Sequence, residues 1–113
     1  MIIKKKDSFE KKNSESCTVW EYEYPGISSG FATALINGRY PDEKRVVNTG
    51  CEEVYYVISG SGIVHSEKGD FEIVQGDLYH FEKNEIYWIE GKELFLAVVN
   101  APKWTPEQYK IVD

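Results

Sequence analysis

Apolar and polar side chains alternate along much of this sequence, in short stretches separated by turn residues. In residues 18–24, Trp20, Tyr22 and Tyr24 would share one face, and the intervening glutamates would share the other. This two-residue period is typical of a β-strand with one buried face. The residues between the stretches are mostly Gly, Asn, Asp and Pro, which favour turns.

The same pattern recurs along the chain and predicts about eight strands. They fall at residues 18–24, 31–37, 53–59, 63–66, 71–74, 78–81, 85–89 and 94–99. No window keeps a helical spacing of apolar residues for long enough to form a sizeable helix. One short helical turn is predicted near the C-terminus, where Thr105 suits the N-cap and Pro106 the first helical position. Short strands at regular spacing indicate an all-β sandwich or barrel.

Length and composition fit one small globular domain. The chain has 113 residues, 42% hydrophobic and 14% aromatic, which is too apolar for a disordered protein. We interpret residues 1–16 as a polar N-terminal arm or edge strand, 17–100 as the barrel and 101–113 as a C-terminal tail. Pro102 should end the last strand, and Trp104 is expected to fold back against the barrel.

The net charge of the chain limits the classes of partner that we expect it to bind. A net charge of −6 disfavours nucleic acid and favours a small-molecule or protein partner. No apolar run approaches the ~20 residues needed to cross a bilayer, so we expect no membrane partner. The basic residues at the start are followed by no apolar core, unlike a secretory signal. We therefore expect a cytoplasmic protein.

The two cysteines, Cys17 and Cys51, form no C-x-x-C pair. Two thiols cannot make the disulfide scaffold of a small secreted protein, so both are expected to be reduced. No basic residue adjoins Cys51 to lower its pKa, and we interpret it as a buried structural thiol.

Residues 51–62, together with Gly69 and residues 76–78, resemble the cupin family. Cupins carry a first motif of the form G-x5-H-x-H-x3–4-E-x6-G, and Glu53 and Gly60 match its last two fixed positions. The resemblance covers about residues 30–100. It implies an RmlC-like, cupin-type double-stranded β-helix, or jelly-roll barrel.

The resemblance also implies a metal site, from which this chain departs. Metal-binding cupins use two histidines and a glutamate of the first motif and one histidine of a second motif. The first-motif histidines fall on Val47 and Thr49, or on Val46 and Asn48 with the other spacing. The second-motif histidine falls on Tyr87. Only the glutamate remains of the usual four ligands, so we predict a pocket with neither metal nor cofactor.

Two histidines elsewhere leave one metal alternative open. Alternation turns His65 outward if Val64 faces inward. His80 would share a face with Leu78 and could look into the barrel mouth. A dioxygenase-like metal enzyme with a displaced ligand set including Glu53 and His80 is therefore an alternative.

If Glu53 faces inward, as in the family, it lies in an apolar and aromatic cavity of the kind that binds small molecules. Alternation turns Tyr55 and Val57 inward from the same strand, and Tyr87 should point inward in place of a ligand histidine. Barrel core is the competing interpretation for the aromatic residues of the first strand. The predicted ligand-binding residues are Trp20, Tyr22, Thr49, Glu53, Tyr55, Val57, His80, Tyr87 and Ile89.

Glu53 and Tyr87 leave the function open. Burial would raise the pKa of Glu53, whereas a hydrogen bond from a tyrosine would favour its charged form. A carboxyl group tuned in this way could act as general acid or base with Tyr87. That chemistry suits a metal-independent isomerase or epimerase, which some metal-free cupins are. Otherwise the cavity binds a small metabolite without turnover, or the two residues simply close the barrel.

Aromatic residues on the other face suggest an interface. With this assignment of faces, Tyr56, Tyr79 and Trp88 would point away from the pocket. Small single-domain cupins usually dimerise, and outward aromatic residues suit a two-fold interface. We therefore expect a homodimer.

Overall fold

The computed structural model describes residues 1–113 and consists mainly of β-strands. Strand accounts for 64% of the residues and helix for 5%. The strands are β1 (Phe9–Ser14), β2 (Cys17–Tyr22), β3 (Gly30–Tyr40), β4 (Arg45–Asn48), β5 (Glu52–Ser66), β6 (Gly69–Val74), β7 (Leu78–Phe81), β8 (Ile86–Ala101) and β9 (Tyr109–Val112). Two single 3-10 turns complete the chain, η1 (Lys5–Asp7) and η2 (Pro106–Gln108). The second is the predicted C-terminal turn, and the first was not anticipated.

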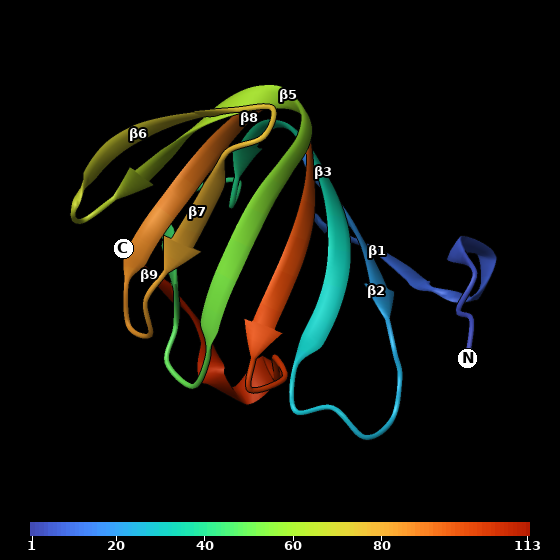
Figure 1. Ribbon diagram of the computed structural model, residues 1–113. Helices are drawn as coiled ribbons and strands as arrows, with labels where there is room; N and C mark the ends of the chain where they lie inside the picture. Colours follow the sequence, from blue (N-terminus) through green and yellow to red (C-terminus); the bar gives the residue numbers. More distant parts are fainter.

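All strand pairs are antiparallel and belong to one curled sheet. Its order is β1-β2-β3-β8-β4-β9, and β5 pairs with β6, β7 and β8. Figure 1 shows β3, β5 and β8 bending over at one end, so that the sheet folds on itself. The predicted all-β jelly-roll barrel is confirmed in this half-barrel form. No helix in the structure is long and apolar enough to span a membrane.

β5 and β8 are long, bent strands where the sequence predicted two strands each. The glycines expected to make a hairpin turn at residues 60–62 instead lie inside β5, where the register with β8 shifts on both sides of Ser59. Gly60 has a φ of +79°, and a Cβ placed on it would lie 1.9 Å from the carbonyl oxygen of Glu93. Glycine is thus required for close approach at a bulge, which uses the same residue types as a turn.

Two strands, β4 and β9, were not predicted, and a third, β1, was expected only as a polar arm or an edge strand. All residues of β1 except Ser14 are exposed, so no alternation marks it. β4 and β9 have four residues each and pair with one another. Edge strands and very short strands depend on their partners rather than on a pattern of their own.

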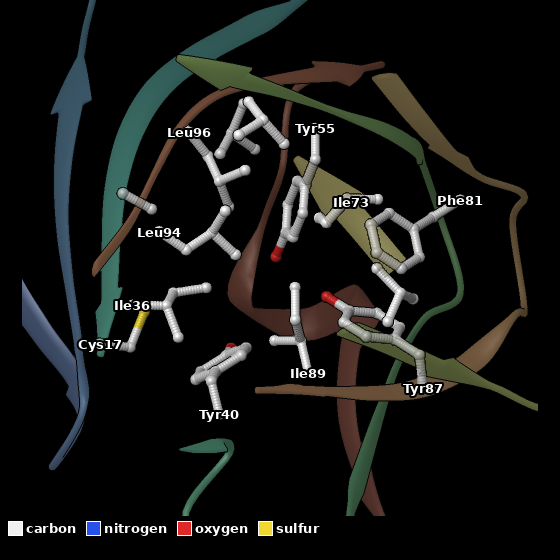
Figure 2. Close-up of a cluster of buried hydrophobic side chains, with 14 of the residues drawn as sticks. Cys17, Ile36, Tyr40, Tyr55, Ile73, Phe81, Tyr87, Ile89, Leu94 and Leu96 are labelled. Carbon is white, nitrogen blue, oxygen red and sulfur yellow. The ribbon is translucent and has the colours of Figure 1, made fainter. Parts of the chain in front are cut away.

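The inner faces of the curled sheet enclose one apolar core. Figure 2 shows side chains from β2, β3, β5, β7 and β8 converging in it. Several are completely buried, namely Ile36, Val46, Val57, Val64, Ile89, Leu94 and Leu96. Val57 and Ile89 were predicted to line the ligand pocket, but they lie in the apolar core instead. The bend of the long strands packs other apolar side chains against them.

Both cysteines are buried free thiols. Burial raises the pKa of Cys17 to about 12 and that of Cys51 to about 11. At neutral pH both are therefore protonated and poor nucleophiles.

Candidate functional site

A cavity of about 830 Å³ occupies one end of the barrel. Side chains from β2, β3, β4, β5 and β8 form its walls, and residues of the C-terminal tail contribute one side. Its rim includes the exposed residues Lys11, Asn13 and Glu23, so the cavity is open to solvent. Its innermost residues are buried: Cys17, Tyr40, Glu53, Tyr55, Tyr87 and Asn100.

Glu53 is the buried carboxyl group of this cavity. It lies near the start of β5, directly opposite Asn100 of β8. Asn100 Nδ2 donates to its Oε2 at 2.5 Å, and the Tyr87 hydroxyl donates to its Oε1 at 3.4 Å. No lysine, arginine or histidine forms an ion pair with it; the nearest polar partners are these neutral groups.

The pKa of Glu53 reflects this setting. Burial raises it to about 7, and hydrogen bonds from Asn100, Tyr87 and Tyr55 limit the rise. Near neutral pH, both the acid and the carboxylate are therefore populated. A carboxyl group in this range can accept a proton and return it within one catalytic cycle.

Four tyrosines surround this carboxyl group. Figure 2 shows Tyr55 and Tyr87 reaching from their strands toward the same interior region. The hydroxyls of Tyr40 and Tyr109 are hydrogen-bonded to each other. Burial raises the pKa of Tyr40, Tyr55 and Tyr87 well above the ordinary value of 10. These hydroxyls therefore stay protonated and serve as donors.

Asn48 forms a second polar group on the wall. Its Oδ1 accepts hydrogen bonds from Trp104 Nε1 at 3.1 Å and from Gln108 Nε2 at 2.9 Å. Trp104 folds back over the cavity and packs against Tyr109, with ring centroids 5.6 Å apart. The tail therefore builds part of the site.

The structure brings four of the nine predicted ligand-binding residues to the cavity, Tyr22, Glu53, Tyr55 and Tyr87. Thr49 is exposed instead, and its hydroxyl donates to the backbone oxygen of Gln108 at 2.7 Å. It follows the last residue of β4 and lies in a loop, where strict alternation no longer determines the direction of a side chain.

The prediction that Trp20 lines the cavity is wrong. In the β2–β3 register, Val19 and Glu21 lie opposite Ala34 and Ala32, whose side is buried. Trp20 therefore lies on the outer face, where its Nε1 donates to Glu10 at 2.8 Å. The alternation was identified correctly, but Trp20 was assigned to the wrong face, whereas Tyr22 at the end of β2 does border the cavity.

The inward carboxylate on β2 has its own partner. Lys11 on β1 forms an ion pair with Glu21 at 2.8 Å, which stabilises a charge on the concave side. This cross-strand pairing could not be seen in the sequence of β2 alone.

His80 also faces the other way from the prediction. It lies opposite Val54, while Tyr79 lies opposite the inward Tyr55. His80 Nε2 is 2.6 Å from Glu52 Oε1 on the outer side of the sheet. The proposed metal ligand set of Glu53 and His80 is therefore wrong, as is the outward orientation expected for Tyr79, which packs against the core.

His65 and Trp88 do face outward. Val64 is fully buried, and His65 stacks on Trp88 with ring centroids 3.9 Å apart. His65 also contacts Asp70 and Glu90, and it does not line the cavity.

The residues of the site do not fit a transition metal. No group of three or more His, Cys, Asp or Glu side chains is placed to hold an ion. The two histidines of the first cupin motif align either with Val47 and Thr49 or with Val46 and Asn48. Of these two pairs, Val46 and Asn48 are the positions that face inward. Valine has no donor atom, and the Asn48 oxygen already accepts two hydrogen bonds.

Sequence reasoning missed several residues of the site, namely Tyr40, Asn100 and Tyr109, and gave Trp104 no role in the cavity. Asn100 continues the inward series of Leu94, Leu96 and Val98, so extending the alternation by one step would have found it. Tyr109 follows no pattern, because β9 is defined by its pairing with β4.

Fold and cavity together define this chain as a small cupin-fold protein. No family model and no curated protein matches its sequence. The solved structure of Pac13, described as a unique nucleoside dehydratase, has a TM-score of 0.88 and 16% identity, covering 99% of this chain and 90% of that chain. Variants of Streptomyces Pac13 have been solved with uridine.

Two other similar structures have different activities. Ectoine synthase from P. lautus has a TM-score of 0.76 and 16% identity, covering 100% of this chain and 91% of that chain. Oxalate decarboxylase from Bacillus subtilis has a TM-score of 0.81 and 17% identity, covering 97% of this chain and 31% of that chain. Identities this low establish the fold, which supports many different reactions.

Proposed function

We propose that this protein is a metal-independent enzyme that transfers protons on a small, uncharged metabolite, with Glu53 as general acid–base. The observation that carries the proposal is a carboxyl group buried at the base of an open cavity, with a pKa raised to about 7 and no cation beside it. General catalysis is most effective when the pKa of the group lies near the working pH.

The reaction class follows from this group. The Glu53 carboxylate would take a proton from a carbon next to a carbonyl, and the electron pair would delocalise onto the carbonyl oxygen. The Tyr87 hydroxyl, which stays protonated, donates its hydrogen bond to the Glu53 carboxylate and orients this base. The carboxylic acid would then return the proton, either to carbon in an isomerisation or to a departing hydroxyl, which leaves as water.

A structural neighbour supports the second outcome. Pac13 is described as a nucleoside dehydratase, and its variants were solved with uridine, which is small and uncharged. This chain has the same fold and its own buried carboxyl group beside tyrosines, and dehydration needs no metal when an acid and a base are available.

Noncatalytic binding is the second candidate. Every side-chain nitrogen or oxygen sealed from solvent already has a hydrogen-bond partner. The sealed polar groups therefore need no substrate to complete their hydrogen bonds, as in a cavity that only holds a ligand.

Solvent-deuterium exchange separates the two candidates. A panel of uncharged hydroxy-aldehydes and hydroxy-ketones, including uridine derivatives, is incubated with the protein in heavy water and followed by proton NMR. We expect exchange at the carbon next to the carbonyl, reduced at least about 100-fold in Glu53→Gln. His80→Gln, which changes an exposed residue, is the control. Exchange that persists in Glu53→Gln, or that occurs with no panel member, would favour binding alone.

The proposal also predicts how kcat/KM depends on pH. If Glu53 starts as the base, kcat/KM should rise as the group ionises, with a midpoint near the value of about 7 that burial gives its pKa. The profile is measured on the most active panel compound between pH 5 and 9. A rate independent of pH across this range would contradict the assignment.

A further inference from the structure

Asn48 holds an amide group in one fixed orientation at the cavity wall. It is 4% exposed, and its Oδ1 contacts Trp104 Nε1 and Gln108 Nε2. An indole N–H can only donate, so the Asn48 atom that faces Trp104 must be the oxygen. The –NH₂ end of the amide therefore points away from Trp104.

Gln108 fixes the same orientation independently. Its Oε1 accepts the backbone N–H of Gly50 at 3.0 Å, and a backbone N–H is only a donor. Its –NH₂ end must then be the one that faces Asn48. Two donor-only groups, one at each end of this chain of hydrogen bonds, thus determine how the Asn48 amide lies.

The Asn48 amide nitrogen has no partner within the protein, since only its oxygen is hydrogen-bonded. No sealed side-chain nitrogen or oxygen lacks a partner, so this nitrogen is reached by solvent. Because the residue is almost entirely buried and lines the cavity, the nitrogen opens into it. An unused donor therefore faces the space that a ligand would fill.

The charges at the base of the cavity disfavour a strongly anionic ligand there. Of the lining lysines, Lys11 is paired with Glu21, and Lys103 donates to the backbone oxygen of Tyr24 at 3.0 Å. Glu53 at the base has no cation beside it. The Lys103 ammonium keeps its charge but is exposed, so a phosphate or carboxylate at the cavity base would meet the Glu53 carboxyl group with no cation beside it.

We propose that Asn48 is a specificity-determining residue, whose –NH₂ group donates a hydrogen bond to the carbonyl oxygen of an uncharged, planar ligand such as a lactam or cyclic amide ring. The aromatic residues of the wall, Tyr22, Tyr24, Trp104 and Tyr109, would contact the ring faces. The inference rests on the proposed function only in taking this cavity as the ligand site, and its test measures binding without turnover.

Two small probes test the donor directly. 1-Methyl-2-pyridone offers only an acceptor, and pyrrole offers only a donor; their binding is measured by titration with protein NMR. We expect the wild type to bind the pyridone at least about tenfold more tightly than pyrrole. Asn48→Asp keeps the oxygen that Trp104 and Gln108 contact but replaces the free donor by an acceptor, so the preference should reverse.

Asn37→Asp is the matched control. Asn37 lies outside the cavity, and its Oδ1 accepts the Glu93 backbone N–H, which a carboxylate would also do. This variant should keep the wild-type preference. Equal binding of the two probes by the wild type, binding of neither, or an unchanged preference in Asn48→Asp would each overturn the proposal.

A second measurement avoids dependence on the variant's folding. In wild-type protein labelled with ¹⁵N on asparagine side chains, the Asn48 amide protons should move downfield on addition of the pyridone and stay in place with pyrrole. No shift with the pyridone would overturn the proposal. If Glu53→Gln loses all exchange activity while these shifts persist, the two proposals stand separately; if exchange survives but the shifts are absent, only the role of Asn48 fails.

Discussion

At the scale of single residues, two buried glutamates show how neighbouring groups determine the protonation state of a carboxyl group. Glu85 is 3% exposed and accepts hydrogen bonds from the hydroxyls of Ser66 and Tyr79 and from the backbone N–H of Glu82. These donors, with Lys68 nearby, outweigh desolvation and lower its pKa. Glu53 also accepts hydrogen bonds from neutral groups but has no cation near it, and burial raises its pKa. The same residue type is thus a structural anion at one site and a titratable acid at the other.

The raised pKa of Glu53 predicts how stability depends on pH. Between the ordinary value of 4.5 and about 7, the folded protein holds a proton that the unfolded chain has released. Stability therefore falls as pH rises through this window, by about 3 kcal/mol in all. Glu53→Gln should abolish this loss. The measurement is the free energy of urea unfolding of both proteins between pH 4.5 and 8.

Glu72→Gln, on the exposed side of β6, is the control and should follow the wild type. Glu85 acts in another window, because a lowered pKa gives stability that is lost only as pH falls below 4.5. An equal pH slope for wild type and Glu53→Gln would show that the carboxyl group is not desolvated as described.

At the scale of the elements, the sequence determined the inward face of β5 and failed on that of β2. For β5, the motif fixed Glu53 as inward, and counting by two then placed Tyr55 correctly. For β2, aromatic content was used to choose the face, and this choice misplaced Trp20, because Glu21 can face inward when it is paired with Lys11 of the neighbouring strand. Periodicity gives which residues share a face, but only the partner strand decides which face is buried.

The glycines show a second limit of the sequence. A glycine with positive φ fits a hairpin turn and a bulge equally well, and the difference lies in what is packed against it. At Gly60 a methyl group would overlap the Glu93 backbone, whereas at Gly76, with a φ of +91°, nothing lies within 4 Å. The former bends a continuous strand, and the latter is an open turn.

This contrast gives a prediction about stability. Gly60→Ala and Gly76→Ala impose the same type of backbone strain, roughly 1–2 kcal/mol. Only Gly60→Ala adds a clash between two paired strands, so its loss should exceed about 3 kcal/mol or prevent folding. Urea unfolding of the two variants is compared with the wild type. Equal losses would mean that the β5 bend does not need the close approach seen at Glu93.

At the scale of the whole molecule, the outer face of the sheet is unusually apolar. The exposed side chains Phe31, Leu35, Tyr56, Ile58 and Val99 come from the neighbouring strands β3, β5 and β8. A monomer rarely leaves such a patch uncovered. The homodimer expected from the sequence stays a prediction, and its contact surface changes, because Tyr79 faces inward and Trp88 is covered by His65 and Arg39.

The dimer is tested by sedimentation equilibrium. We expect the wild type to sediment at twice its chain mass, and Tyr56→Lys to shift the equilibrium toward monomer, since a charge would be buried at the interface. Phe71→Lys changes a similarly exposed residue on β6, away from this face, and should leave the mass unchanged. A monomeric wild type would remove the prediction.

Detachment of the short β9 strand would determine what fraction of the time the cavity is fully formed. This strand pairs only with β4, and its residues are half-buried or exposed, so it should detach from the sheet at a lower cost than the central strands. Gln108 lies immediately before it and Trp104 shortly before η2; both orient Asn48, and Tyr109 belongs to β9. Each detachment would release the amide and one aromatic wall together. The apparent affinity would then scale with the fraction of time that β9 is docked, and hydrogen exchange at Tyr109 to Val112 would report that fraction.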